Sequence, residues 1–512
     1  MNKNLFDLTS YISVIDTRGQ TPVKDYSIAC ICMDSRAALS HSLFVCIKGY
    51  LSDGHNYALS AYDKGARVFI VEKLLNLPED AYQLLVSDSR VALARLSAAY
   101  YGHPAKKMRL IGLTGTKGKT TTALYLRNIL EEAGIPTGYI GTNGIMYHDV
   151  CLETANSTPE SLILHKNLYD MAEAGIRAVV LEVSSQGLWM HRVEGITFDA
   201  CIFTNLSDDH IGEMEHPDMH HYRACKKLLF TDHSDQNTCV VCNADDPASA
   251  YMTEGIASSI IHISTNPQSN HDYIAYNIET KQPSYGLSTV FDCRLKGKAL
   301  PLSGSIPTAG EFNVKNALCA TAVACEAFGV SPESALRTLS HTRVEGRFEA
   351  LVFPSLPGVK FVIDYAHNGL SMASALDALR PCTQNRLICV FGSVGCRSKG
   401  RRAELAVAAG PRADLCILTS DNPYGENPME ILKEIDQAFP DGSCPRELIS
   451  DRRQALARAV DIAQAGDVIL LAGKGHEHTQ VIQGKTMPYN ERETLESIVF
   501  QKDGSISNIL PY

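Results

Sequence analysis

From Arg109 onward, short apolar runs alternate with longer segments of helical periodicity, and this alternation restricts the fold more than any other feature. The runs RLIGL, YIGT, AVVLEVSS and DACIFTNL flank amphipathic segments such as TTALYLRNILEEAG, which Gly134 closes. Apolar runs of this length between helices indicate parallel strands that are covered on both faces. We therefore expect an α/β sheet here.

A second alternating block begins near Arg343. FVIDYAH, RLICVFGS, LCILTSDNP and DVILLAGKGH are each typical of a strand followed by a polar loop, with helices expected to begin near residues 369, 402, 428 and 452. In parallel sheets, ligands gather at the loops that follow the carboxyl ends of the strands. Each polar motif in this block lies at such a position.

The chain has 512 residues, which is too long for one hydrophobic core, and Gly102 to Pro104 interrupt the pattern as a domain boundary would. We expect three α/β domains. They are a small mixed α/β N-terminal domain (1–106), a central P-loop ATPase-like parallel sheet (107–341) and a C-terminal Rossmann-like domain (342–512).

Composition excludes several classes of protein. A net charge of −10 disfavours nucleic acid as a partner, and the absence of a long apolar run disfavours a membrane span. The N-terminus lacks the pattern of a signal peptide, so a cytoplasmic location is expected. The sixteen cysteines lie in apolar stretches and are expected to act as core residues. Cys239 and Cys242 have no second pair nearby, which disfavours a zinc site there.

The strongest local motif is GLTGTKGKT (112–120), between a predicted strand and a predicted helix. A glycine-rich turn at this place points backbone N–H groups at phosphate oxygens, and the helix N-terminus adds positive potential. Lys119 can reach the outer phosphates, and the Thr120 hydroxyl can bind Mg²⁺. The strict G-x-x-x-x-G-K-[ST] spacing fails because Leu113 replaces its first glycine. We interpret the motif as a nucleotide site, which alone does not distinguish ATPases, kinases and ligases.

With the other motifs in their order, the chain resembles the Mur ligase family, and within it the type that extends the peptide of the peptidoglycan precursor. The motifs are DSR (34–36), GTKGKTT (115–121), NSTPE (156–160), EVSSQGL (182–188), TNLSDDH (204–210), YRACK (222–226), NADD (243–246), GEFNVKN (310–316), EGRFE (345–349), DYAHN (364–368), DNPYGENP (421–428) and GKGHE (473–477).

The resemblance implies an ATP-dependent, ADP-forming ligase. ATP phosphorylates a carboxylate to an acyl phosphate, and an amino group then attacks it to give an amide. Because the reacting oxygens are anionic, such a site must concentrate positive charge. The resemblance assigns catalysis to Lys119, Glu182, His210 and Lys226. It assigns Mg²⁺ binding to Thr120, Glu182, His210 and Lys226, the last as a carbamate. Lys226 is chosen over its neighbour Lys227 because it follows Tyr222 by four residues, as the corresponding lysine does in the family.

Three further histidines, His216, His220 and His221, are expected on a solvated helix entrance rather than in a metal cluster. The resemblance assigns ATP binding to Gly115, Thr116, Lys117, Gly118, Lys119, Thr120, Thr121, Asn316, Arg347 and Asp364.

The carboxylate substrate is expected to resemble UDP-N-acetylmuramoyl-L-alanyl-D-glutamate, bound through the N-terminal domain. By resemblance its contacts are Ser35, Ser157, Thr158, Ser184 and Arg192. One departure is Gln186, where the family often has histidine. The partners are thus small molecules, and the chain is expected to act as a monomer, although the sequence carries no signal of oligomeric state.

The incoming amino acid is expected at the C-terminal domain, and here the resemblance weakens. Ligases that add meso-diaminopimelate typically carry arginine after DNP, and this chain has Tyr424. A phenol cannot offer a charged fork to a distal carboxylate, so L-lysine is favoured, with diaminopimelate or ornithine as alternatives. The expected contacts are Arg402, Asp421, Asn422, Tyr424, Gly473 and Glu477. The Arg402 assignment rests on CRSKGRR, which departs from the family's usual sequence.

Two other functions stay open. One is a paralogous amide ligase that acts on another carboxylate; folylpolyglutamate synthetases share the phosphate loop but not the EVSS, DYAH and GKGHE set. The other is a nucleotide-binding regulator without catalysis, which the retained Lys119, Glu182, His210 and Lys226 disfavour.

Overall fold

The computed structural model describes residues 2–49, 52–208, 211–212, 215–283, 286–396 and 399–503. The described chain divides into two compact units, one of residues 1–263 with 319–331 and one of residues 264–318 with 332–512. The expected boundaries near residues 106 and 341 stay a prediction. Among the described helices, none combines the length and apolarity that a membrane crossing requires.

The N-terminal segment of the first unit is a small sheet in the order β2-β7-β6-β5-β4, parallel except for the β2–β7 pair. Its core has two sides because alternate strand residues face opposite ways. One side packs on α1 and α3, and the other on α2. The elements here are β1 (Lys3–Asn4), α1 (Leu5–Thr9), β2 (Asp16–Arg18), β3 (Ser27–Ile28), β4 (Cys30–Cys32), η1 (Ser35–Ala37), β5 (Ser42–Val45), η2 (Gly54–Tyr57), α2 (Ala58–Asp63), β6 (Val68–Val71), β7 (Tyr82–Leu85), α3 (Ser89–Tyr100) and η3 (Pro104–Lys107).

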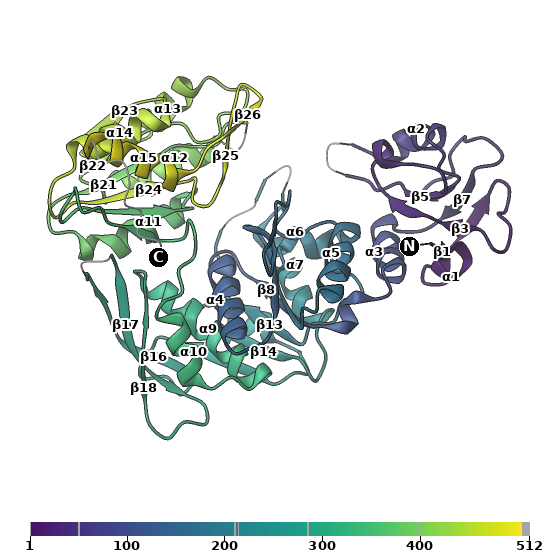
Figure 1. The fold of residues 1–512 in the computed structure, drawn as a ribbon, viewed down its shortest axis with the longest axis horizontal. Helices are drawn as coiled ribbons and strands as arrows, with labels where there is room; N and C mark the ends of the chain where they lie inside the picture. The colour runs from purple at the N-terminus through teal and green to yellow at the C-terminus, as the bar shows by residue number, and fades with distance from the viewer. Residues whose placement is uncertain are drawn as a thin grey trace. The chain divides into compact units, whose positions relative to one another are not determined.

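The rest of the first unit is built on the expected parallel sheet (Figure 1), in which strands run in the order β9-β12-β8-β13-β14-β15, with β10 and β11 added antiparallel. Helices α5 and α7 pack on one face, and α4 packs against β9 and β12. The elements are β8 (Arg109–Thr114), α4 (Lys119–Glu132), β9 (Thr137–Gly141), β10 (Gly144–Tyr147), β11 (Val150–Leu152), α5 (Ser161–Glu173), β12 (Ala178–Glu182), α6 (Ser185–Trp189), β13 (Ala200–Phe203), α7 (Met219–Thr231), β14 (Cys239–Asn243), α8 (Ser249–Thr253) and β15 (Ile260–Ser264). The helix α9 (Glu311–Phe328) belongs to this unit from Cys319 onward and to the second unit before it.

The second unit contains an antiparallel set, β16-β17-β18, and a separate sheet in the order β19-β20-β24-β21-β22-β23, parallel except for the β19–β20 pair. Its elements are β16 (Tyr273–Lys281), β17 (Ser288–Leu295), β18 (Leu302–Ile306), α10 (Pro332–Leu339), β19 (Glu349–Leu351), β20 (Lys360–Asp364), α11 (Gly369–Leu379), η4 (Arg380–Cys382), β21 (Leu387–Phe391), α12 (Gly400–Ala409), β22 (Leu415–Leu418), α13 (Pro428–Gln437), β23 (Arg446–Leu448), α14 (Arg452–Ile462), β24 (Val468–Ala472), β25 (Thr479–Ile482), β26 (Lys485–Pro488) and α15 (Glu491–Asp503).

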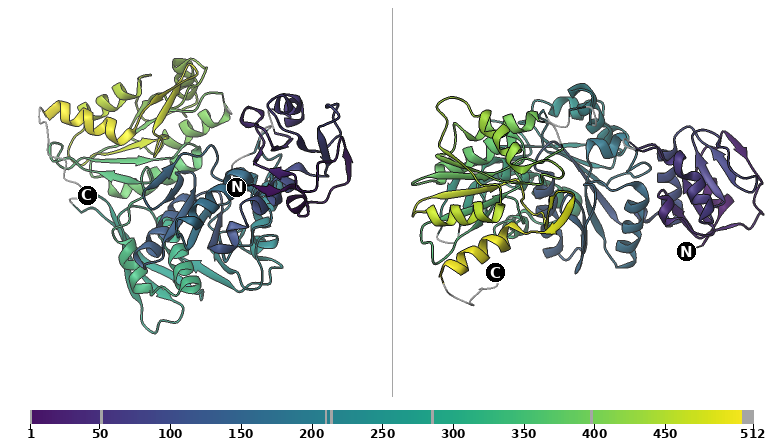
Figure 2. Two further views of the ribbon diagram at one scale, coloured as in Figure 1. Left: turned by 45° about the vertical axis from the view of Figure 1, so that its right-hand side comes forward. Right: turned by 90° about the horizontal axis from the view of Figure 1, so that it is seen from above.

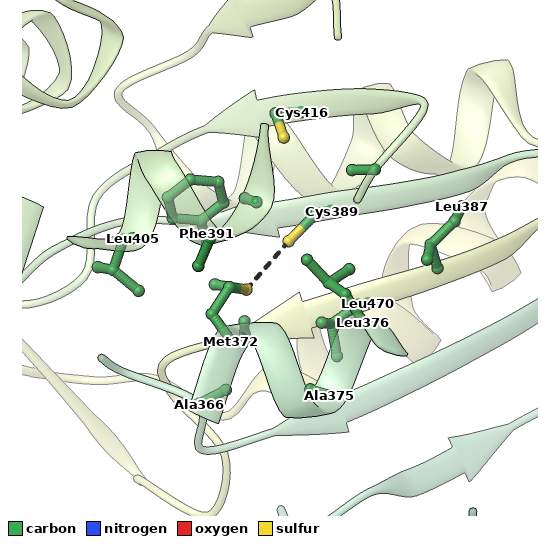
Figure 3. Packing of buried hydrophobic residues seen from close by; sticks show 14 of the residues in the cluster. Ala366, Met372, Ala375, Leu376, Leu387, Cys389, Phe391, Leu405, Cys416 and Leu470 are labelled. Atoms are coloured by element: carbon green, nitrogen blue, oxygen red, sulfur yellow. Dashed lines mark hydrogen bonds between the residues drawn. The ribbon is translucent and has the colours of Figure 1, made fainter. Parts of the chain in front are cut away.

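The faces of the parallel sheet in the second unit are covered by different helices. Alternate residues of β24 divide between them: Val468 and Leu470 face α11, α12 and α13, whereas Ile469 and Leu471 face α14 and α15. Figure 2 shows α15 in yellow along the sheet. In the first of these clusters the sulfur atoms of Met372 and Cys389 lie 3.6 Å apart (Figure 3). All sixteen cysteines are free thiols, and many are buried, as the sequence predicted.

A buried ion pair fixes α14 to α15. The Arg452 guanidinium lies 2.7 Å from the Glu491 carboxylate, and both side chains are fully buried. Arg452 also donates to the carbonyl oxygens of Ser420 and Ala472, where β22 and β24 end. The pair therefore anchors the two strand-end loops that follow.

We expect Arg452→Met to lower the free energy of unfolding by about 3–5 kcal/mol, because it leaves the Glu491 carboxylate buried without its cation. Urea unfolding followed by far-UV circular dichroism measures the change. Arg453→Met, at an exposed position of the same helix, is the matched control and should shift stability by about 0.5 kcal/mol or less. Fluorescence of Trp189, the single tryptophan, reports the first unit in the same samples. An unchanged urea midpoint in Arg452→Met would show that the pair does not hold the unit.

Candidate active site

The glycine-rich loop lies where the sequence placed it, between β8 and α4. Gly115 and Gly118 both adopt positive φ, at 149° and 82°. A Cβ atom on Gly115 would lie 2.0 Å from the Thr204 hydroxyl, so only glycine fits. Thr120 and Thr121 form the first turn of α4, and both are buried. The turn has the form of a phosphate-binding loop at a helix N-terminus.

The loop after β13 holds the phosphate loop in place. The Asn205 carbonyl accepts the Thr116 N–H at 2.8 Å, and the Asn205 side chain accepts the Lys117 N–H at 2.9 Å. The hydroxyl of Thr204 donates to the Lys117 carbonyl at 2.7 Å. Tyr222 of α7 adds a hydroxyl contact to Thr116 at 3.2 Å. These bonds fix the loop's backbone before any ligand binds.

Two lysines converge on one backbone oxygen of this loop. The Nζ atoms of Lys119 and Lys226 lie 2.8 Å and 2.9 Å from the Gly115 carbonyl oxygen. Lys226 is only 2% exposed, and its ammonium also lies 4.4 Å from the centre of the Tyr222 ring. The two ammonium groups are therefore within about 6 Å of each other, where like charges repel. The arrangement suits an anionic ligand or a chemical change at one lysine.

Glu182 lies at the carboxyl end of β12, paired in register with Leu113 of the neighbouring β8. Its side chain is fully buried and accepts hydrogen bonds from neutral donors: the Tyr139 hydroxyl at 2.5 Å, and the Thr142 N–H and hydroxyl at 3.1 Å and 3.0 Å. A buried carboxylate and the Thr120 hydroxyl are the hard oxygen ligands that Mg²⁺ prefers. These residues fit a magnesium site. His210 lies outside the described residues.

Side chains predicted to hold the sugar-peptide surround Glu182. The Thr158 hydroxyl donates to the Glu182 carbonyl at 2.9 Å and contacts the Ser184 hydroxyl at 3.1 Å. Ser157 bonds to the hydroxyl of Thr142 at 2.8 Å. Arg192 donates to the carbonyl of Thr158 at 3.0 Å. Ser157, Thr158, Ser184 and Arg192 thus form one hydroxyl-rich and cationic network.

Glu160 extends this network towards the N-terminal segment. It pairs with Arg192 and with Arg90 of α3, both at 2.9 Å. Ser35, the residue predicted near the UDP group, begins η1 in that segment and is 8% exposed.

The other predicted nucleotide contacts belong to the second unit. Asn316 on α9 is buried, with its amide 3.3 Å from the side-chain oxygen of Asn313. Asp364 ends β20 and accepts the Phe348 N–H at 2.9 Å. The Arg347 guanidinium lies over the Tyr365 ring, 4.7 Å from its centre.

Loops after β22 and β24 bring the predicted amino-acid contacts together. Lys474 is fully buried, and its ammonium lies 2.5 Å from Glu477 and 3.1 Å from the side-chain oxygen of Asn422. The Asn422 amide donates to Glu477 at 3.0 Å. A Cβ on Gly473 would lie 2.8 Å from the Asp421 carboxylate, so glycine lets that carboxylate approach. Burial raises the pKa of Asp421, and the nearby Lys474 partly offsets this.

Tyr424 follows these residues on a loop that is fixed by its backbone. Its N–H donates to the Val481 carbonyl at 3.1 Å, and its carbonyl accepts the Gly484 N–H at 3.2 Å. Its φ of 51° is in the left-handed region, and its side chain is half-buried. The loop is therefore held against β25, while the phenol is partly accessible.

Arg402 does not present an open guanidinium in this structure. It is 2% exposed and bonded to Glu426 at 2.8 Å and Glu434 at 2.5 Å. Its role towards the substrate's α-carboxylate stays a prediction. To bind that carboxylate, Arg402 would have to release Glu426 or Glu434.

The expected solvated helix entrance is wrong for His216. Its side chain is fully buried, although His220 is exposed and His221 is half-buried. Sequence reasoning also missed Tyr139, Asn205 and Lys474 as partners of the predicted residues. Asn205 and Lys474 lie inside the motifs TNLSDDH and GKGHE, so the motifs themselves carried a signal for those two.

Comparisons with known proteins agree along the whole chain. Three family descriptions match: "Mur ligase family, catalytic domain" at residues 27–101, "Mur ligase middle domain" at 113–324 and "Mur ligase, glutamate ligase domain" at 346–475. A UDP-N-acetylmuramoyl-L-alanyl-D-glutamate--2,6-diaminopimelate ligase of Caldanaerobacter subterraneus subsp. tengcongensis is 38% identical over 479 residues, covering 93% of this chain and 95% of that protein.

Solved structures show the same architecture. The structure of a ligase with the same name has a TM-score of 0.67 and 25% identity, covering 98% of this chain and 100% of the other. The MurF ligase of Thermotoga maritima in complex with ADP has a TM-score of 0.61 at 18% identity, covering 92% and 97%. The fold is therefore the three-domain α/β fold that the sequence predicted.

The extent of these matches and the geometry at Gly115 and Glu182 lead to one assignment. The chain belongs to the Mur ligase family and is an ATP-dependent, ADP-forming amide ligase.

Proposed function

We propose that the chain adds a diamino acid to the D-glutamate of UDP-N-acetylmuramoyl-L-alanyl-D-glutamate, and that this amino acid is meso-diaminopimelate. The observation that carries the proposal is the 38% identity, over 93% of the chain, to a ligase named for 2,6-diaminopimelate. This similarity favours diaminopimelate over lysine, which Tyr424 alone had favoured. The reaction supplies a peptidoglycan precursor, and its nucleotide-linked substrate and ATP are consistent with the expected cytoplasmic location.

In the first step a carboxylate oxygen of the substrate attacks the terminal phosphorus of ATP, the bond to ADP breaks, and an acyl phosphate forms. Lys119 is suited to this step because its ammonium lies at the loop that would carry the phosphates. Bound Mg²⁺ would offset the charge of the phosphate oxygens, held by Thr120 and Glu182 with His210 and the Lys226 carbamate.

In the second step the free amine attacks the acyl carbon, and phosphate leaves. Ser157, Thr158, Ser184 and Arg192 support a role in orienting the acyl group, because they surround Glu182 in the same network. Asp421, Asn422 and Glu477 are suited to bind amino groups, since all three offer oxygen acceptors.

An amino-acid panel tests the proposal. With the UDP-dipeptide, ATP and Mg²⁺, we expect meso-diaminopimelate to give a higher kcat/KM than L-lysine or L-ornithine, with the product identified by its mass. A clear preference for lysine would restore the interpretation based on Tyr424. Phosphate release without the dipeptide, or with none of the three amino acids, would point to a different ligase.

Tyr424 provides a second test. We expect Tyr424→Arg to raise the ratio of kcat/KM for diaminopimelate over lysine by about tenfold, because a bidentate guanidinium–carboxylate pair is worth roughly 1.4 kcal/mol more than a neutral bond. Tyr424→Phe is the matched control and should lower the ratio. Both variants keep a Cβ at φ 51°, so neither adds backbone strain. An unchanged ratio in both would remove Tyr424 from the specificity of the enzyme.

We also propose that Lys226 is carbamylated. Modification would turn one of two crowded cations into an anion, which relieves its repulsion with Lys119. Intact mass measured in bicarbonate should show one added carbon dioxide.

We expect Lys226→Arg, which keeps the positive charge but cannot form a stable carbamate, to lose about 100-fold in kcat. The neighbouring Lys227→Arg is the control, since that ammonium pairs with Glu254 at 3.3 Å, and it should keep near wild-type activity. Full activity in Lys226→Arg would show that the cation itself is used.

A further inference from the structure

A second group of metal-ligating side chains lies beside the phosphate loop and has no part in the proposed reaction. His216, His221 and Cys225 each offer one ligand atom, and these atoms all lie within 4.8 Å of one another. We call them the His–His–Cys cluster. His221 and Cys225 are four residues apart on α7, so they share one face of that helix.

The cluster is buried by residues from two helices. His216 is fully buried and Cys225 is 5% exposed. The indole of Trp189, at the end of α6, lies 5.7 Å and 4.8 Å from the rings of His216 and His221, measured between ring centres. His216 is fully buried, so each of its ring nitrogens needs a partner, and one of these partners is a second imidazole beside a thiol.

The hydrogen bonds of His216 prepare it to bind a metal. Its Nε2 lies 2.8 Å from the Ser185 hydroxyl, and its Nδ1 lies 2.8 Å from Nδ1 of His221. When Nε2 carries a proton and donates to Ser185, the lone pair of His216 Nδ1 points at His221. A second partner that fixes the tautomer in this way is the usual companion of a histidine metal ligand.

The spacing agrees with a tetrahedral ion. Zinc with bonds of about 2.05 Å to nitrogen and 2.3 Å to sulfur places two nitrogen ligands about 3.3 Å apart and a nitrogen and a sulfur about 3.6 Å apart. Cys225 Sγ lies 3.7 Å from Nδ1 and 3.8 Å from Nε2 of His221, so the imidazole has to rotate to direct one nitrogen at the ion. The two Nδ1 atoms, at 2.8 Å, need to separate by only about 0.5 Å, as the shared proton leaves.

We propose that the His–His–Cys cluster is a binding site for Zn²⁺ or a similar borderline-soft divalent ion. Two imidazoles and a thiolate select such an ion over Mg²⁺, which prefers oxygen ligands. Binding releases the thiol proton and the proton shared by the imidazoles, and leaves a fourth position for water. The ion would bridge the segment at His216 to α7, one residue before Lys226. This site is independent of the proposed function.

Cobalt is the probe. The full-length protein, stripped with a chelator, is titrated with Co²⁺ in excess Mg²⁺, and thiolate-to-cobalt absorption and the visible bands of tetrahedral Co²⁺ are recorded. We expect one equivalent of Co²⁺ to bind with both signals and one equivalent of Zn²⁺ to displace it.

Matched variants locate the site. Cys225→Ser should abolish the thiolate band, His221→Ala should weaken Co²⁺ binding more than tenfold, and Ser185→Ala should weaken it about tenfold through loss of the bond to His216. Cys242→Ser, which removes another buried thiol of the same unit, should leave the band unchanged. Far-UV circular dichroism reports that each variant is folded. A band that is absent in the wild type, survives in Cys225→Ser or is lost in Cys242→Ser would overturn the proposal.

Discussion

Two ammonium groups meet at the carbonyl oxygen of Gly115, and the rest of the first unit is arranged around that crowding of positive charge. Backbone amides and a helix N-terminus add to it. Like charges this close repel each other, so the loop that carries them needs support from neighbouring segments. The loop at Asn205 does this through hydrogen bonds to the backbone of the phosphate loop. The absence of a side chain at Gly115 is what allows the two loops to touch. Rigidity before binding is also what electrostatic catalysis requires.

Glu182, on the neighbouring strand β12, supplies a carboxylate at the same end of the sheet as the two lysines. Its partners are a phenol, a hydroxyl and an N–H, all of them neutral, so its negative charge is stabilised without being cancelled. A carboxylate satisfied by an arginine would offer little to a metal ion. Parallel pairing of β8 and β12 puts the carboxylate and the lysine-bearing loop at the same end of the sheet. The topology therefore brings the carboxylate and the lysine-bearing loop to the same end of the sheet, which is where α/β folds usually bind ligands.

The central strands and most helices of both parallel sheets could be predicted from the sequence, because apolar runs such as AVVLE and VILLA are typical of strands that are covered on both faces in an α/β protein. The strands β15 and β23, each at one end of a parallel set, were not predicted. Residues of the motifs NSTPE and EVSSQGL lie together around Glu182. The partners contributed by distant segments could not be predicted. Tyr139, whose hydroxyl donates to Glu182, precedes it by 43 residues in the sequence. His216 looked like a surface residue because its burial depends on Trp189 and Ser185, which precede it by about thirty residues. Arg402 looked like a free cation because Glu426 and Glu434 carry no motif of their own.

The residue at position 424 is not sufficient by itself to predict which amino acid the ligase adds. Tyr424 suggested a substrate without a distal carboxylate, on the sound premise that a phenol carries no charge. The surrounding loops, however, place two carboxylates, Asp421 and Glu477, against one ammonium, Lys474. Lys474 is already shared between Glu477 and Asn422, so the cluster favours amino groups and leaves a distal carboxylate to be bound elsewhere. Both lysine and diaminopimelate satisfy such a cluster. In the proposed reaction, discrimination between them would therefore depend on neighbouring groups such as the half-buried Tyr424, whose phenol is a neutral donor.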